Sequence, residues 1–405
     1  MSSNPTQTFD VVVIGGGPAG AIAATDLARL GRSVLLLDRG GRIKPCGGAI
    51  PPRAMEEFEI PKDMLVATVA SARMISPSNH KVNMPIENGY VGMVDREPFD
   101  EWLRERAAEN GAVRCTGTFD RLLRDDDGTA VIQYHARTGE PEQVRARAVI
   151  GADGANSTVA RQCIPGAEKM RYVFAYHEII KTPETVSEAV DFDPTRCDVY
   201  YQGKLSPDFY AWIFPHGTTI SVGVGSAHKG FSLRQAVAEL RKDTGLDQTE
   251  TLRSEGAPIP LKPLRVWDNG RDVLLAGDAA GVVAPASGEG IYYAMLGGRL
   301  AAESVDAYLT TGDASKLKLA RKRFHKDHGR VFWILGIMQH FWYANDKRRE
   351  RFVMMCKDPD VQRLTWESYM HKKLTRKSPL AHIKIFFKDT AHLLGLIRVP
   401  KKTDG

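Results

Sequence analysis

The chain has 405 residues, of which 43% are hydrophobic and 26% charged, and its net charge at pH 7 is +6. This length predicts two intertwined domains, and the composition excludes a disordered, fibrous or membrane-spanning protein. The charge is uneven: residues 330–405 hold 16 Lys and Arg against 7 Asp and Glu, whereas residues 1–329 hold 39 against 42. Because the basic character is confined to the C-terminal part, we do not expect nucleic acid as a partner.

The cysteines indicate the compartment. There are five, an odd number without a Cys-x-x-Cys pair: Cys46, Cys115, Cys163, Cys197 and Cys356. This pattern argues against a disulfide framework and a structural zinc site, and it indicates a reducing environment. The first eight residues are polar and too short for a secretory signal, and no apolar run reaches the length of a membrane span. We therefore expect a cytoplasmic protein with no metal site.

A strand, a glycine-rich turn and a helix follow one another near the start. Residues 9–14 predict a buried strand and residues 21–30 a helix, and between them lies the motif Gly-x-Gly-x-x-Gly of Gly15, Gly17 and Gly20. The first glycine permits a tight turn, the second lets the backbone approach a pyrophosphate, and the third lets the helix pack closely on the strand. Asp38 follows a second strand, where a carboxylate accepts a hydrogen bond from a ribose hydroxyl. Together these features predict a dinucleotide site.

The next loop, residues 39–52, is dense in glycine and proline and contains Cys46 between Pro45 and Gly47. Such a thiol is either a half-buried structural cysteine or a reactive group, and its place beside the dinucleotide crevice favours the second interpretation. A helix is predicted from Asp95 to about Asn110, because a proline and acidic residues suit its first turn.

Two later strands also run into turns with glycine and aspartate. The first of the two begins at Arg147, after predicted strands at 113–119 and 130–135, and it enters a turn that contains Asp153. Asp-Gly turns are common in hairpins, but after a buried strand this turn resembles a second loop in contact with the nucleotide.

The last apolar strand of this kind, residues 272–276, enters a turn at Asp278, and Gly288 and Gly290 then open a helix of small residues that ends near Leu309. Asp278 is placed to accept a hydrogen bond from a ribityl hydroxyl. The N–H groups at the start of the helix can stabilise negative charge on a reduced flavin ring.

Between these turns the pattern changes to alternation and aromatic residues, which predicts successive strands at 174–180, 198–202, 209–214 and 219–224. Alternation places Tyr210, Trp212 and Phe214 on one face of the sheet. This apolar wall suits either a sheet core or the binding of an apolar ligand, and spacing alone leaves both open. A helix is predicted at 233–244 and an extended segment at 256–261.

The basic tail contains two apolar stretches. Residues 331–343 are too few to span a bilayer. Residues 383–397 carry apolar side chains at helical spacing with Lys384 and Lys388 among them, which indicates an amphipathic helix. This helix either packs on the body of the protein or touches an anionic membrane surface.

The three glycine–aspartate motifs, in this order, resemble the FAD-binding framework of para-hydroxybenzoate hydroxylase-like flavoproteins. Within that superfamily, Pro45-Cys-Gly-Gly48 and Tyr210-x-Trp-x-Phe-Pro215 resemble the geranylgeranyl reductase family. The longer segment Lys44-Pro-Cys-Gly-Gly-Ala-Ile-Pro51 is most similar to the branch of this family that acts on chlorophyll and bacteriochlorophyll. The resemblance by motif extends from about Phe9 to Leu309.

The resemblance implies an activity and roles for these residues. FAD would contact Arg39 and Arg96 besides the glycines and aspartates named above. NADPH would reduce it, and the sequence leaves open a protein such as ferredoxin as the reductant instead. The enzyme would saturate double bonds of a geranylgeranyl chain, carried by a tetrapyrrole or by a diphosphate, to form a phytyl chain. Cys46 would act at the reacting alkene as an acid or a positioning thiol, and the aromatic wall would line the chain's tunnel.

The predicted fold is α/β, with a Rossmann-like FAD-binding domain, an inserted, mainly antiparallel substrate domain and a helical C-terminal region. The predicted divisions are residues 1–165, with an interleaved substrate segment at about 50–95, then 166–265, 266–312 and 313–405. Four alternatives remain: an aromatic monooxygenase or a halogenase of the same framework, a geranylgeranyl-lipid reductase, and a non-catalytic protein of the membrane surface. The Trp-x-Trp-x-x-Pro signature of the halogenases is absent from the sequence.

Overall fold

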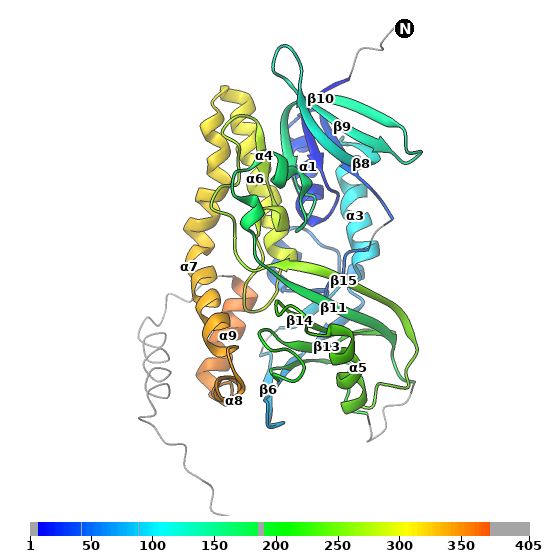
Figure 1. Cartoon of the computed structure of the whole chain (residues 1–405), viewed down its shortest axis with the longest axis vertical. Helices are drawn as coiled ribbons and strands as arrows, with labels where there is room; N and C mark the ends of the chain where they lie inside the picture. The colour runs from blue at the N-terminus through cyan, green and yellow to red at the C-terminus, as the bar shows by residue number, and fades with distance from the viewer. Residues whose placement is uncertain (1–6, 42, 88, 185–189, 373–405) are drawn as a thin grey trace, which may run out of the picture.

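The computed structural model describes residues 7–41, 43–87, 89–184 and 190–372 (Figure 1). A parallel sheet lies at the centre of its N-terminal half, in the order β8 (Val113–Arg124), β2 (Val34–Asp38), β1 (Thr8–Ile14), β10 (Pro141–Gly151) and β16 (Val273–Leu275). Apolar residues on both faces account for β1, β2, β16 and the second half of β10, as parallel strands between layers require. The helices α1 (Pro18–Arg29), α3 (Arg96–Glu109) and α6 (Ile291–Thr311) pack beside one another and against this sheet.

β8 and β10 are longer than the apolar runs predict, because each of them pairs with one neighbour along its first part and with another along its second part. β8 begins parallel to β2 and continues antiparallel to β9 (Ala130–Ala136). β10 begins antiparallel to β9 and ends parallel to β1. The first half of β10 is polar and partly exposed, so its apolar run marks only the half that enters the parallel sheet.

A second sheet lies below the first in Figure 1, in the order β15 (Thr251–Pro260), β11 (Tyr172–Lys181), β14 (Thr219–Ser226), β13 (Ala211–His216), β12 (Arg196–Tyr200), β5 (Ser71–Ile75) and β6 (Lys81–Pro85). Its neighbouring strands are antiparallel except β12 and β5. The helix α5 (Leu233–Asp243) packs on β11 and β14. Thus residues 71–85 join strands that follow residue 170, which agrees with the α/β fold containing an inserted, mainly antiparallel sheet.

Shorter elements join the two sheets. The strands β3 (Ala49–Ile50), β7 (Val91–Met93) and β4 (Ala67–Val69) form a small sheet. The helices α2 (Pro52–Glu57) and α4 (Thr158–Cys163) follow β3 and β10, and turns of 3₁₀ helix lie at Lys62–Met64, Ala167–Lys169, Gly277–Ala280 and Ala314–Leu317.

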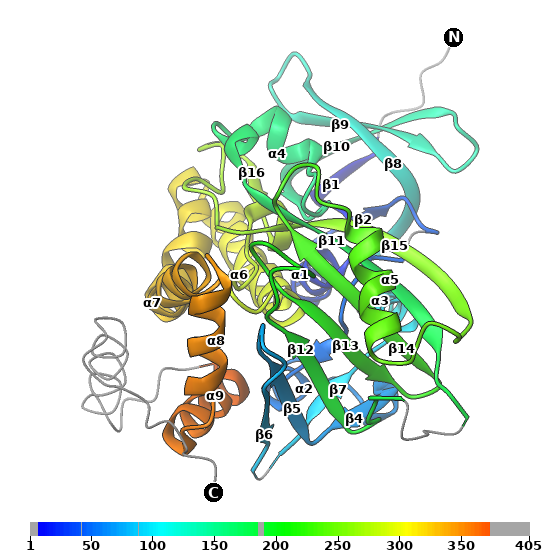
Figure 2. The ribbon, with the colours of Figure 1, turned by 60° about the horizontal axis from the view of Figure 1, so that its bottom comes forward.

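The C-terminal region is helical, and its last described helix ends at His371. α7 (Lys318–Trp342) packs on α6, and α8 (Asp346–Met355) and α9 (Pro359–His371) lie beside the edge of the second sheet that β6 forms (Figures 1 and 2). The stretch 331–343 is the second half of α7 and its C-cap. Within the described residues, no helix combines the length and the apolar character that a membrane crossing needs. The predicted amphipathic helix at 383–397 lies outside the described residues.

Candidate cofactor and substrate site

Strand register brings the three predicted turns to one edge of the parallel sheet. Ile14 pairs with Leu37 on one side and with Gly151 on the other, and Gly151 pairs in turn with Leu275. Parallel strands in register end together, so the residues that follow these four positions are neighbours. The turns that begin at Gly15, Ala152 and Ala276 therefore form one crevice, where open α/β sheets bind their ligands.

The three glycines of the first turn have distinct surroundings. A Cβ on Gly15, which has φ +104°, would lie 2.3 Å from the carbonyl oxygen of Ala152, and a Cβ on Gly20 would lie 1.8 Å from that of Gly15. Both positions are closed by backbone. A Cβ on Gly17, in contrast, would meet no atom within 4 Å. The open space lies at the start of α1, where free N–H groups and the helix dipole favour a phosphate, so the turn fits a dinucleotide.

Asp38 lies at the end of β2 and faces this turn. Its carboxylate accepts hydrogen bonds from the N–H groups of Gly16 at 2.7 Å and of Gly40 at 2.8 Å. Arg39 beside it is exposed. Arg104, which belongs to none of the sequence motifs, donates to the carbonyl oxygen of Gly16 at 3.2 Å. Asp38 and Arg39 thus lie beside the turn, at the end predicted to hold the adenosine.

Asp153 follows β10 in the second turn, and its carboxylate faces α4. It accepts hydrogen bonds from the Ser157 hydroxyl at 2.5 Å and from the backbone N–H of Thr158 at 2.7 Å. Burial raises the pKa of Asp153, and these bonds partly oppose the rise. The carboxylate organises the start of α4, while the backbone of the same turn contacts Gly15.

Asp278 follows β16 in the third turn and is paired with a cation. Its buried carboxylate forms an ion pair with the ammonium group of Lys44, whose side chain is partly exposed. Lys44 precedes the Pro45–Gly48 segment, so this pair ties the cysteine loop to the third turn. The pair was not predicted, because a lysine in a loop is most often solvated.

The segment predicted to contact the flavin opens α6. Gly288 has φ +64°, a conformation that favours glycine, and Gly290 is the N-cap of the helix. The N–H of Ala284 donates to the carbonyl oxygen of Glu289, and the N–H of Gly288 donates to that of Ala284, both at 2.9 Å. We call residues 287–290 the flavin loop. A Cβ on Gly290 would lie 3.8 Å from a carboxylate oxygen of Asp278, so the loop adjoins the third turn.

The cysteine loop, residues 45–48, packs directly on β13. A Cβ on Gly47 would lie 2.9 Å from the Phe214 ring, and one on Gly48 would lie 2.5 Å from the imidazole of His216. The thiol of Cys46 is half-buried and accepts the N–H of Gly48 at 3.4 Å. Substituted glycines would separate the loop from the strand.

Arg96 lies beside the Cys46 thiol rather than in the open crevice. It is 5% exposed and forms two hydrogen bonds with the Asp100 carboxylate, at 2.8 and 2.7 Å. Burial favours its neutral form, but Asp100 and the Cys46 thiol raise the pKa of Arg96 above its usual value. A charged guanidinium therefore faces Cys46.

Tyr210, Trp212 and Phe214 lie on one face, as alternation predicts. The ring centroids of Tyr210 and Trp212 are 6.0 Å apart, and those of Trp212 and Phe214 are 6.2 Å apart. The Tyr210 hydroxyl donates to the carbonyl oxygen of Ser287 at 2.5 Å, and the Trp212 indole donates to Ser221 at 3.1 Å. The row therefore spans from the flavin loop, at Tyr210, to the cysteine loop, at Phe214.

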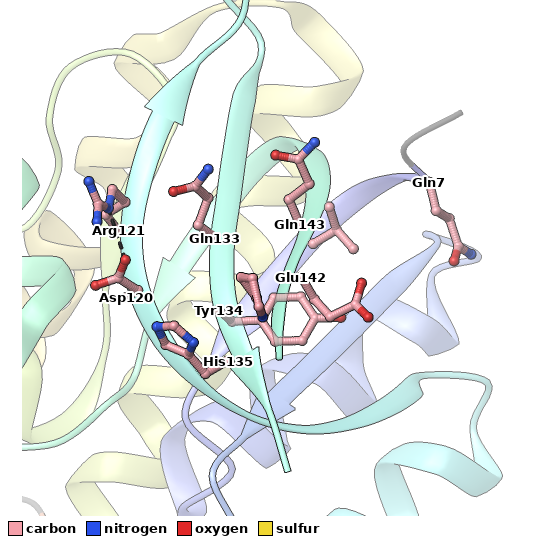
Figure 3. A pocket seen from close by; sticks show the side chains of 10 residues that line it. Gln7, Asp120, Arg121, Gln133, Tyr134, His135, Glu142 and Gln143 are labelled. Atoms are coloured by element: carbon pink, nitrogen blue, oxygen red, sulfur yellow. Dashed lines mark hydrogen bonds and ion pairs between the residues drawn. The ribbon is translucent and has the colours of Figure 1, made fainter. Parts of the chain in front are cut away.

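A polar hollow of about 620 Å³ lies away from these loops, on β8, β9 and β10 (Figure 3). Figure 3 shows polar side chains around it, among them Gln133, Gln143 and Glu142. None of the predicted site residues is among those that line it. In the described part of the chain, no group of three or more His, Cys, Asp and Glu side chains is arranged to hold a metal ion.

Comparison with known proteins identifies the family. A model described as an FAD binding domain matches residues 8–326. The geranylgeranyl diphosphate reductase of Rhodobacter capsulatus is 59% identical over 389 residues, which cover 96% of this chain and 98% of that protein. Digeranylgeranylglycerophospholipid reductase 1 of Methanopyrus kandleri is 33% identical, over 80% of this chain and 88% of that protein.

A solved structure has the same fold. It is that of a geranylgeranyl bacteriochlorophyll reductase-like protein from Thermoplasma acidophilum, and it matches with a TM-score of 0.80 and 23% identity, covering 97% of this chain and all of that one. The glycine turn that fits a dinucleotide thus lies within the region that the FAD-binding model matches. The chain belongs to this family of FAD-binding proteins, and within it to the group that includes the geranylgeranyl diphosphate reductases.

Proposed function

We propose that the protein is an FAD-dependent reductase that saturates C=C bonds of a geranylgeranyl chain, carried by a (bacterio)chlorophyll or a diphosphate, to form a phytyl chain. The observation that carries this proposal is the position of the aromatic row, which begins just before β13 at Tyr210 and joins the flavin loop to the cysteine loop. The names of the similar proteins support the same chemistry.

The apolar row suits a prenyl chain. Each buried CH₂ group contributes about 0.8 kcal/mol, so a C20 chain is held by contact with rings without many polar groups. A row of three aromatic residues also lets the chain move along its own direction, which brings successive double bonds to the same place. Tyr210, Trp212 and Phe214 are the proposed lining residues.

The reaction adds a hydride and a proton to the two carbons of an alkene. FAD, when bound and reduced, would supply the hydride. Gly15, Gly17, Gly20 and Asp38 would hold its adenosine and pyrophosphate, with Arg39, and Asp278 and the flavin loop would hold the ribityl chain and the ring. Cys46 is the proposed acid or positioning group at the alkene, with Arg96 facing its thiol. Asp153 would support the first turn through the backbone beside it.

NADPH is the proposed reductant. The sequence contains no second Gly-x-Gly-x-x-Gly of the type that binds a nicotinamide cofactor, which suits a reductant that binds transiently. Mixing the holoenzyme with NADPH without oxygen should bleach the flavin absorbance, and NADH should do so more slowly. Bleaching by reduced ferredoxin alone would contradict this choice.

An anaerobic assay tests the function. Reduced protein is mixed with geranylgeranyl-bacteriochlorophyll, geranylgeranyl-chlorophyll or geranylgeranyl diphosphate, and the products are weighed by mass spectrometry. Successive gains of two hydrogens on one substrate are expected. No gain on any of the three would refute the reductase, and substrate-dependent oxygen consumption in air would instead indicate a monooxygenase.

A geranylgeranyl lipid is the second candidate substrate, because the Methanopyrus kandleri relative is named for such a lipid. Digeranylgeranylglycerophospholipid therefore belongs in the same assay. Reduction of the lipid alone would select this candidate.

We also propose that the protein contacts an anionic membrane from the cytoplasm, because its proposed substrates carry a chain that partitions into lipid. One stripe of α7 is exposed and carries Lys322, Lys326 and Arg330 followed by Trp333 and Ile337, of which the last two are 67% and 48% exposed. Basic residues beside an exposed tryptophan suit a negatively charged lipid surface.

Deletion of residues 379–405 is expected to weaken binding of the protein to anionic liposomes, because the deletion removes the predicted amphipathic helix. Sedimentation with vesicles of phosphatidylglycerol measures the loss, and neutral vesicles are the control. Trp333→Ser combined with Ile337→Ser should weaken binding further. Equal sedimentation of all forms would contradict the membrane contact.

In this proposal, residues 1–165 and 266–312 hold FAD, residues 166–265 with 50–95 bind the substrate chain, and residues 313–405 form the membrane-facing region.

A further inference from the structure

Glu289, between the two glycines of the flavin loop, carries a buried carboxylate. Its side chain is 7% exposed, and one oxygen lies 2.5 Å from the ammonium nitrogen of Lys372. The other oxygen is buried without a hydrogen-bond partner among the described residues. Burial raises the pKa of Glu289, and Lys372 opposes the rise. A carboxylate in this setting depends on its one cation.

Lys372 is more deeply buried than its partner and lies at the end of α9. Its side chain is 1% exposed, and its nitrogen is 3.9 Å from the centroid of the Tyr369 ring and 5.6 and 5.7 Å from those of Tyr292 and Tyr293. Burial lowers the pKa of Lys372, and Glu289 opposes this. The aromatic faces and the carboxylate together replace the water that a lysine loses on burial.

The backbone of Lys372 also indicates a specific position. Its φ is +53°, which is uncommon for a residue other than glycine, and its N–H donates to the carbonyl oxygen of Ser368 at 3.0 Å. The preceding carbonyl, that of His371, accepts a hydrogen bond from Arg53 of α2. α2 follows the cysteine loop through β3. The end of α9 therefore contacts the flavin loop, through Glu289, and the helix that follows the cysteine loop.

α9 also lies against the aromatic row. Trp366, Tyr369 and Met370 pack on the same apolar cluster as Phe214. The C-terminal region therefore packs on the cluster that also contacts the Phe214 end of the aromatic row. The family model ends at residue 326, before this helix begins.

We propose that Lys372 is a positioning residue that holds the flavin loop through Glu289 and makes α9 a wall of the site. The inference rests on the proposed function, because that proposal assigns the flavin loop to the flavin ring. The paired charges keep the carboxylate neutralised at the start of α6. Without Lys372, the negative charge of Glu289 would repel the negative charge of a reduced flavin ring, which the start of α6 would otherwise stabilise.

Two single variants should change the flavin in opposite directions. Lys372→Met leaves a carboxylate and should lower the flavin midpoint potential, whereas Glu289→Gln leaves a cation and should raise it. Each should also weaken FAD binding to apoprotein by at least about tenfold. Spectroelectrochemistry measures the potential, and fluorescence titration of apoprotein with FAD measures the affinity.

The double variant completes a double-mutant cycle, which shows whether the effects of the two changes depend on each other. Glu289→Gln with Lys372→Met removes both charges at similar volume, so its FAD affinity should be closer to that of the unmodified protein than either single variant's. If Lys372→Met does not fold but the double variant does, the uncompensated carboxylate is the cause and the pairing is supported. If both fail to fold, or if the effects of the single changes simply add, the pairing is overturned.

Lys357→Met is the matched control, since Lys357 is exposed and lies just after α8. It should leave potential and affinity unchanged. Lys372→Arg should restore most of the FAD affinity, because it keeps the charge. Equal potentials in Lys372→Met and Glu289→Gln would overturn the inference without touching the reductase, since neither measurement uses a substrate. A protein that binds FAD normally but reduces no substrate would instead refute the proposed function.

Discussion

Gly17→Ala is expected to leave the protein folded but to weaken FAD binding by about a hundredfold, or ~2.7 kcal/mol. The backbone of Gly17 has φ −75° and ψ −177°, which alanine adopts without strain, and the added methyl group would meet no protein atom within 4 Å. It would instead occupy the space through which the pyrophosphate approaches the start of α1. Titration of apoprotein with FAD measures the affinity, and far-ultraviolet circular dichroism checks the fold.

Gly20→Ala is the matched comparison and should act on folding. Its Cβ would lie 1.8 Å from the carbonyl oxygen of Gly15, which is backbone and cannot move without separating α1 from β1. Overpacking of this kind costs about 1–3 kcal/mol and at times more. Chemical denaturation of the apoprotein should therefore show reduced stability in Gly20→Ala but not in Gly17→Ala. Loss of stability in both would contradict the assignment of the open space to the cofactor.

Cys46→Ala is expected to lower turnover of the geranylgeranyl substrate by about a hundredfold or more, the usual contribution of a positioned acid. The thiol faces the charged Arg96 and lies in the loop that packs on Phe214. FAD content should stay normal, because the predicted cofactor contacts lie on other turns. Turnover in the anaerobic assay and the flavin absorbance of the purified protein measure the two quantities.

Cys46→Ser separates chemistry from loop structure. A hydroxyl still accepts the N–H of Gly48, as the thiol does, but it is a far weaker acid. If Cys46 acts as an acid, Cys46→Ser should be as slow as Cys46→Ala; activity retained in the serine variant would show that the residue only holds the loop. Cys163→Ala, at the end of α4, is the control for loss of a thiol.

For Asp153 the sequence pattern predicts the position of the turn but not the direction of the side chain. The pattern of a strand followed by Gly-Ala-Asp-Gly predicts correctly that the turn adjoins the first one, because parallel strands that start in register end together. The direction of the Asp153 side chain depends on α4, because its carboxylate accepts hydrogen bonds from the first N–H groups of that helix. No local pattern specifies that choice, since the same carboxylate could face either the crevice or the helix.

The α/β fold, the order of the glycine turns and the alternation that puts Tyr210, Trp212 and Phe214 on one face are predictable from the residues alone, because they depend on local backbone geometry and on the period of a strand. The ion pairs Lys44–Asp278 and Glu289–Lys372, in contrast, become visible only in the folded chain. Their partners are far apart in the chain, and a lysine is usually solvated unless folding buries it beside a carboxylate. Burial, which decides whether such a charge needs a partner, is a property of the packed molecule.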